Sequence, residues 1–152
     1  MAASRRPSES RRERGVSAGR DRPPGWPAVL LSLLASHLAG DVLMQTEWQA
    51  VNKAGGLRET RSRKALLAHV SAYTASFLPA LVWIGRRTSV QRAVTVGGAV
   101  AIPHLLVDDG RLVGVWLREV KRTQDPPPGL IIAVDQSFHV ICLLGAALVA
   151  AE

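Results

Sequence analysis

The sequence predicts an all-α fold, in which four transmembrane helices run up and down as a bundle behind a disordered N-terminal tail. Two observations predict this fold. Residues 23–40, 65–85 and 93–107 carry no Asp, Glu, Lys or Arg, and residues 126–151 carry Asp135 alone. About 20 apolar residues suffice for a helix to cross a bilayer. Most basic residues outside the tail lie in short clusters between these stretches, as in the loops of membrane proteins.

Each expected helix follows from its own pattern. The second carries no charged residue, whereas the others contain an Asp, which costs about 2.5–3.5 kcal/mol at the centre of a membrane helix. We therefore expect these helices to be stable as a bundle rather than singly. Pro103 predicts a kink in the third helix, and the prolines at 126–128 end the linker before the fourth. The expected helices are residues 27–48, 65–85, 92–116 and 130–151, within one domain of residues 26–152.

The tail, residues 1–25, is rich in Arg, Ser, Pro and Glu and has no apolar face to bury, which predicts disorder. It supplies much of the formal net charge of +7. The chain has few aromatic residues and no helix-turn-helix or zinc-finger spacing, so a nucleic-acid partner is not expected. Membrane lipid is the expected partner, and the expected location is the cell membrane, with several spans.

The histidines carry the functional signal. Three of the four pair with an Asp four residues away, and residues i and i+4 lie on one face of a helix. In an up-down bundle, all four histidines and their three partners fall in the same half of the membrane. Ionisable groups inside a membrane face the bundle interior and indicate function. The expected ligands of a metal ion are His37, Asp41, His69, His104, Asp108, Asp135 and His139.

Imidazole and carboxylate ligands suit a divalent ion, for which zinc is expected first, with manganese and iron as alternatives. One ion with outer carboxylates fits this set, and so do two ions that share a carboxylate. A bound ion could generate a hydroxide nucleophile from water. A carboxylate that is not a ligand could act as general base, for which the candidates are Asp41, Asp108 and Asp135.

Further polar residues lie near this set in the sequence. Gln45 continues the face of the first pair, whereas Gln136 neighbours Asp135 but points elsewhere on the helix. Arg111 lies seven residues after His104 and could receive a phosphate or a carboxylate, although an arginine at the membrane interface is the simpler interpretation. Tyr73 is expected to be an interfacial aromatic residue rather than a catalytic one.

Four stretches resemble a known family. HLAGDVLMQTEWQAVNK, ALLAHVSAYT, PHLLVDDGR and DQSFHV are similar to motifs of the domain of unknown function 3307 family, small bacterial and phage proteins with about four membrane helices. The resemblance covers about residues 30–150 and omits the tail. The resemblance adds Asn52 and Lys53 as residues that orient the metal-binding side chains or contact the substrate. Glu47 stands where the family usually has Asp.

The expected function is that of an integral membrane protein with a metal site inside the membrane. A looser similarity to membrane-bound metal-dependent hydrolases implies hydrolysis of a lipid-linked or membrane-embedded substrate. One alternative is a non-enzymatic membrane protein whose buried His and Asp residues fix helix packing or bind a partner. Another is a soluble helical protein with a carboxylate-bridged pair of metal ions.

Overall fold

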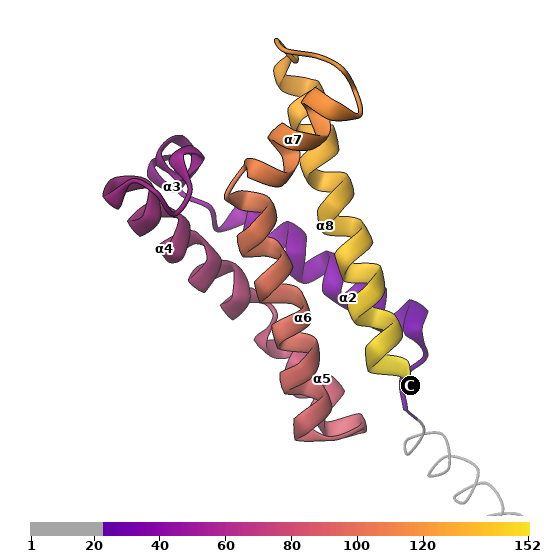
Figure 1. Ribbon diagram of the computed structural model, residues 1–152. Helices are drawn as coiled ribbons and strands as arrows, with labels where there is room; N and C mark the ends of the chain where they lie inside the picture. Colours follow the sequence, from indigo (N-terminus) through magenta and orange to yellow (C-terminus); the bar gives the residue numbers. More distant parts are fainter. Residues whose placement is uncertain (1–22) are drawn as a thin grey trace, which may run out of the picture.

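The computed structural model describes residues 23–152, and in this range the protein is entirely helical (Figure 1). Residues 1–22 of the predicted disordered tail lie outside the described residues. Besides the α-helices there is one π-helical turn, η1, and one 3-10 turn, η2. The elements are α2 (Trp26–Leu38), η1 (Ala39–Leu43), α3 (Glu47–Asn52), η2 (Lys53–Gly55), α4 (Thr60–Ser76), α5 (Leu78–Arg87), α6 (Val90–Asp108), α7 (Arg111–Glu119) and α8 (Pro128–Ala151).

Three segments are long and apolar enough to cross a membrane: Trp26–Leu43, Val90–Asp108 and Pro128–Ala151. The consecutive helices α4 and α5 together make a fourth candidate span, bent by 44°. These spans alternate in direction along the chain, as predicted for an up-down bundle (Figure 1). Their outer faces expose large apolar side chains such as Leu31 and Ile102, which suits contact with lipid.

The helix boundaries differ from the predicted ones in three places. The first span ends at Leu43 rather than at residue 48, because Thr46 caps the separate helix α3 through a reciprocal capping box with Gln49. The second begins earlier, at Thr60, and breaks at Phe77, just before a proline in the first turn of α5.

The predicted third helix, residues 92–116, is two helices in the structure. Helix α6 continues through Pro103 and ends at Asp108, and α7 begins at Arg111. Gly110 between them has a φ of 78°, a left-handed conformation that glycine adopts without steric cost. The chain therefore turns at this point, and α7 leaves the axis of α6 (Figure 1). The fourth helix closely matches its prediction.

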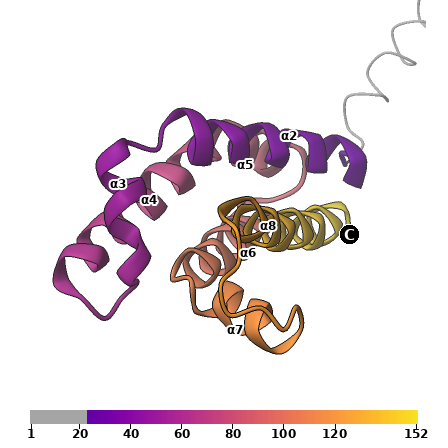
Figure 2. The ribbon, with the colours of Figure 1, turned by 90° about the horizontal axis from the view of Figure 1, so that it is seen from above.

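The bundle has a closed end and an open end. Viewed along the bundle, α2 with α4 and α5 forms one layer and α6 with α8 the other (Figure 2). Between these layers, toward the closed end, lies a core that includes Leu33, Phe77, Ile84, Val96 and Leu143. At the open end the arm of α3 and α4 diverges from the arm of α7 and α8 (Figure 1).

Close contact between the first two spans depends on Gly40 in η1. A Cβ atom at this position would lie 2.7 Å from the Ser76 Oγ atom and 3.0 Å from the Tyr73 Cα atom. The Ser76 hydroxyl also donates a hydrogen bond across this contact to the Ser36 carbonyl oxygen, at 2.8 Å. The backbone of the first span can therefore approach α4 only with glycine at position 40.

We expect Gly40→Ala to lower the free energy of unfolding by about 1–3 kcal/mol, because the added methyl group overpacks this contact. Thermal unfolding in detergent micelles measures the change. Gly145→Ala is the matched control, since a Cβ atom there meets nothing within 4 Å. Equal unfolding midpoints for the two variants would show that the first two spans do not pack closely at Gly40.

Candidate metal centre

Six of the seven expected ligands come together at the base of the open end, in two groups that share Asp108. Each group offers ligand atoms that all lie within 4.8 Å of one another. The residues come from η1, α4, α6 and α8, so every candidate span contributes. The first group is Asp41, His69, His104 and Asp108, and the second is Asp108, Asp135 and His139.

The first group has the spacing of a coordination shell. His69 Nε2 lies 3.1 Å from His104 Nε2 and 3.1 Å from Asp108 Oδ2. Asp41 Oδ1 is 3.2 Å from the same His69 nitrogen, and His104 Nε2 is 3.5 Å from Asp108 Oδ2. Ligands at 2.0–2.1 Å around a tetrahedral ion would be about 3.3 Å apart. These atoms could therefore hold a metal ion with little rearrangement.

The second group uses the other oxygen of the shared carboxylate. His139 Nε2 lies 3.6 Å from Asp108 Oδ1, whereas Asp108 Oδ2 faces the first group. His139 Nδ1 donates to the backbone carbonyl oxygen of Asp135 at 2.9 Å. This bond leaves the proton on Nδ1 and a lone pair on Nε2, the form that binds a metal. Asp108 is thus placed to bridge two ions.

The structure places His37 outside both groups. Its Nδ1 atom lies 3.1 Å from the Tyr73 hydroxyl oxygen, and its Nε2 atom lies 3.0 Å from Oε1 of Gln136. Because an amide oxygen only accepts, Nε2 carries the proton and Nδ1 accepts from Tyr73. Both ring nitrogens are therefore engaged in hydrogen bonds.

Gln136 connects this histidine to the carboxylates. Its amide nitrogen donates to Asp41 Oδ2 at 2.9 Å and to Asp135 Oδ2 at 3.2 Å. One side chain thus orients a carboxylate from each group and leaves the other oxygen of Asp41 free to face His69. The sequence placed Gln136 beside Asp135 but on another part of the helix surface, whereas in the structure its side chain contacts both carboxylates.

Lys53 also reaches the carboxylates, from η2. Its Nζ atom donates to Asp108 Oδ2 at 2.7 Å and lies 3.9 Å from Asp41 Oδ1. Gln45, with its amide oriented to satisfy both neighbours, accepts from Lys53 Nζ at 2.8 Å and donates to the backbone oxygen of Asp41 at 3.2 Å. Lys53 supplies one positive charge beside three carboxylates, which leaves two negative charges when the imidazoles are neutral. One divalent ion would balance this charge, and a second would leave two positive charges in excess.

Several buried polar atoms lack a hydrogen-bond partner within residues 23–152, as expected where a cation fits. Asp41 Oδ1 and His139 Nε2 are two of them, and both present lone pairs toward their groups. The Nδ1 atoms of His69 and His104 are also buried without a partner, which departs from the usual metal-bound imidazole, whose other nitrogen donates. The donor set as a whole fits a divalent ion bound through the Nε2 atoms.

Tyr73 is a site residue that sequence reasoning misassigned. The interfacial prediction is wrong, because the side chain is 1% exposed and stacks on His104, with ring centroids 3.4 Å apart and planes 1° from parallel. It also donates to His37. Its position one turn after His69, on the same helix face, was the signal that could have placed it here.

Two expected residues lie away from the ligand groups. The Asn52 side chain donates to the Trp48 backbone oxygen within α3. Arg111 is about half exposed and pairs with Asp109 at 2.8 Å. Asp109, which the sequence did not single out, has another role, because its Oδ1 atom accepts from the Leu57 backbone N–H at 2.8 Å and so ties the loop after η2 to the end of α6.

A comparison of the sequence with family models gives one match. The family described as "Protein of unknown function (DUF3307)" matches residues 29–151. The chain belongs to this family. The matched range includes every residue of the two ligand groups, and it begins after the Arg-rich tail. Neither the curated proteins nor the solved structures contain a match to the chain.

Removal of the His104 and His139 side chains should abolish stoichiometric metal binding, because each ligand group then loses one nitrogen ligand. We expect His104→Ala with His139→Ala to contain less than about a tenth of the wild-type metal, since each lost ligand costs more than tenfold in affinity. Elemental analysis of detergent-purified protein measures it. Asn52→Ala is the control and should retain its metal, because the Asn52 side chain donates to Trp48 within α3, away from both groups; equal loss in the two proteins would refute this ligand assignment.

Proposed function

We propose that this member of the DUF3307 family is an integral protein of the cell membrane with a two-metal centre bridged by Asp108. We further propose that it is a metal-dependent hydrolase, acting on a lipid-linked or membrane-embedded substrate. The single observation that supports this function best is that one buried carboxylate faces a ligand group with each of its oxygens. Zinc is the proposed ion, and manganese and iron suit the same donors.

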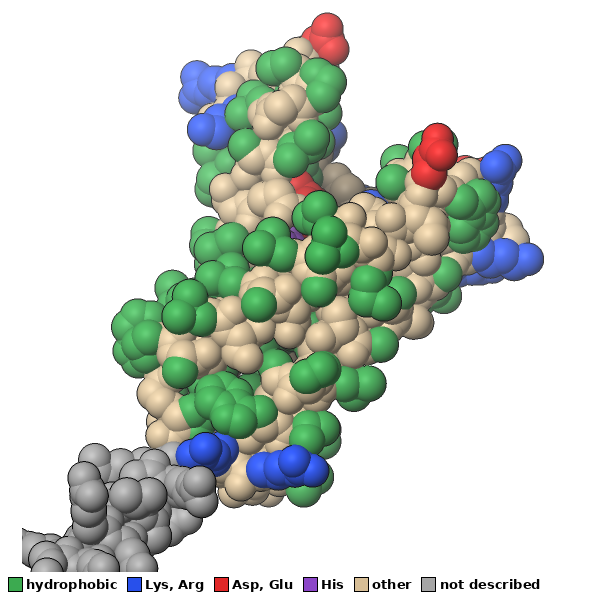
Figure 3. Space-filling view, turned by 180° about the vertical axis from the view of Figure 1, so that it is seen from behind, with side chains coloured by type: hydrophobic (Ala, Val, Ile, Leu, Met, Phe, Trp, Pro, Cys, Tyr) green, Lys and Arg blue, Asp and Glu red, His purple; other side chains and the backbone are tan. Residues whose placement is uncertain are grey.

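A cleft beside the ligands supports a catalytic role. It has a volume of about 730 Å³ and lies between the two arms of the open end. Figure 3 shows the notch between the arms, with acidic and histidine side chains at its base. The residues that line it include Asp41, Asp108 and Asp135, so a molecule in the cleft would contact the proposed ligands directly.

When bound, the ions would supply a hydroxide nucleophile at neutral pH and a charge that stabilises the transition state. The second group has three protein ligands, which leaves coordination positions for water and substrate. Its member Asp135 has a side chain that is 26% exposed, against 7% for Asp41 and 2% for Asp108. Of the three carboxylates, Asp135 is therefore the ligand most open to water in the cleft.

A non-enzymatic polar network is the second candidate. The short contact between Lys53 and Asp108 favours it, since an ammonium group already neutralises part of the buried charge. Gln136 likewise holds Asp41 and Asp135 through ordinary hydrogen bonds. In this function the site would fix the packing of the spans and bind no ion. The third alternative, a soluble two-metal protein, is disfavoured by the exposed apolar faces of the candidate spans.

The number of ions and the hydrolytic activity test the proposal together. We expect two ions per wild-type chain, one in Asp135→Asn and almost none in Asp108→Asn, because Asp108 serves both groups and Asp135 only one. Hydrolysis of lipid carboxylate and phosphate esters in mixed micelles should fall in both variants by at least about a hundredfold, and chelation should abolish it. A folded wild-type protein that takes up no metal would instead establish the polar network.

A further inference from the structure

The cleft has a charged end and an apolar end, and this division indicates what it binds. Lys53 and the three carboxylates lie at one end. The other end is lined by apolar residues of α7 and α8. We propose that the cleft binds a phosphate ester of an apolar alcohol, with the phosphate at Lys53 and the chain along α7 and α8. This inference rests on the proposed function and names its substrate class.

At the charged end, the Lys53 ammonium group is held in a fixed position. The Lys53 side chain is 19% exposed, and its ammonium group lies between Gln45, Asp41 and Asp108. Its position is fixed from outside the site, because the Leu57 N–H bonds to Asp109 and Gly56 adopts a left-handed φ of 61° against that aspartate. A lysine that is anchored and largely buried loses little freedom when it binds an anion.

Phosphate suits this end of the cleft. Lys53 neutralises part of the negative charge of Asp41 and Asp108. A divalent ion bound to these two carboxylates would neutralise that charge in its place. The ammonium group could then donate to an anion in the cleft, and lysine is a common phosphate ligand. Phosphate has enough oxygens to contact Lys53 and metal ions together, an arrangement that is common in two-metal phosphatases.

The apolar end has the shape for a chain. Its lining includes Val113 and Leu117 of α7 and Ile131 and Ile132 of α8, two helices that pack on each other through Val113, Leu117 and Val134. Gly114 lies between Val113 and Leu117 in the sequence and also lines the cleft. It leaves space there, because a Cβ atom at this position would meet only the flexible end of the Arg118 side chain, at 3.6 Å. This lining belongs to the arm of α7 and α8, which also exposes Val115 and Ile132, so a chain that lies along it would continue toward the outer apolar faces of the bundle.

The reaction that follows is the hydrolysis of a phosphoester. The oxygen of water forms a bond to phosphorus, and the bond between phosphorus and the ester oxygen of the apolar alcohol breaks. One proton of the water ends on that alcohol, and the products are inorganic phosphate, or a phosphomonoester, and the free alcohol. No oxidant, reductant or second substrate is needed.

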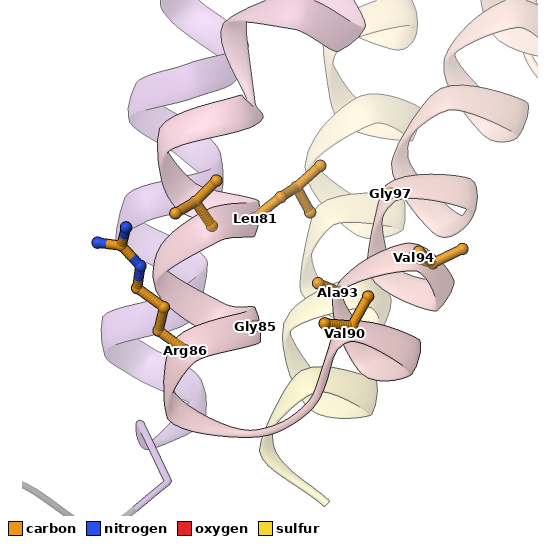
Figure 4. A pocket seen from close by; sticks show the side chains of 8 residues that line it. Leu81, Gly85, Arg86, Val90, Ala93, Val94 and Gly97 are labelled. Atoms are coloured by element: carbon orange, nitrogen blue, oxygen red, sulfur yellow. The ribbon is translucent and has the colours of Figure 1, made fainter.

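A second groove of the protein is apolar but lacks the buried charge of the cleft. It lies between α5 and α6 at the opposite end of the bundle and is lined by Leu81, Val90 and Val94 among others (Figure 4). The charged residue in its lining, Arg86, is exposed and extends along α5 away from α6 (Figure 4). An apolar molecule could enter both grooves, but the cleft at the ligand groups also presents a buried charge to a phosphate.

Binding of a phosphonate tests the inference without turnover, because a phosphorus–carbon bond cannot be hydrolysed as an ester. Full-length protein in maltoside micelles is titrated by calorimetry with octylphosphonate, methylphosphonate and octanol, before and after loading with zinc. We expect octylphosphonate to bind at least about tenfold more tightly than either comparator, since it alone engages both ends of the cleft.

Four variants assign the two ends. Lys53→Gln should weaken octylphosphonate binding at least about tenfold, since a charged hydrogen bond is lost, and Lys53→Arg should restore most of it. Gly114→Leu should weaken it similarly by filling the apolar end. Gly145→Leu is the matched control and should bind normally, because its position on α8 has open space around it.

Three results would overturn the inference. Equal affinity for methylphosphonate would mean a site for free phosphate, and equal affinity for octanol would mean unspecific apolar binding. Normal binding in both Lys53→Gln and Gly114→Leu would place the ligand elsewhere. Failure of the hydrolase activity alone is distinguishable, because the zinc-loaded protein would then still bind octylphosphonate while lipid phosphates stay intact. Conversely, hydrolysis of carboxylate esters without phosphonate binding would refute the substrate class alone.

Discussion

The carboxylate of Asp108 is the group on which the open end of the protein depends. Its Oδ2 atom lies within 3.5 Å of His69, His104 and Lys53, and its Oδ1 atom faces His139. A buried carboxylate is costly unless several partners compensate it. Since these partners come from α4, α6, α8 and the turn η2, the charge of one side chain requires four separate parts of the chain to meet at one point.

This requirement explains the irregular features around the site. The π-helical turn carries Asp41 into the first group, and π-turns inside α-helices are frequent at functional sites. Gly40 in the same turn allows the close approach to Tyr73, which packs on His104. The turn at Gly110 directs α7 away from α6, and so opens the cleft immediately beyond Asp108. The regular packing of the closed end needs none of these features.

The local spacing of residues allowed much of this to be predicted. Uncharged stretches gave the spans, and an up-down order placed seven side chains, three pairs of His and Asp together with His69, at one depth; the structure brings six of these seven together. The reason is that helical periodicity fixes which residues share a face, and alternation of direction fixes their depth. Neither depends on details of packing.

What could not be predicted depends on contacts between elements. The sequence pairs His37 with Asp41 on one helix face, but Asp41 lies in the π-helical turn η1, and the hydrogen-bond partners of His37 are Tyr73 and Gln136. The reach of Lys53 into the site depends on a short turn held by Asp109, some 50 residues away in the sequence. The break of the predicted third helix depends on the left-handed Gly110 rather than on Pro103, which the helix accommodates.

Electron paramagnetic resonance of the protein loaded with Mn²⁺ tests the central claim, the bridge through Asp108, most directly. Two ions that share a carboxylate lie about 3.5–4 Å apart and are magnetically coupled. We therefore predict the broad spectrum of a coupled pair in the wild-type protein. The resolved hyperfine pattern of isolated Mn²⁺ at full loading, or the absence of bound Mn²⁺, would contradict a bridged two-metal centre.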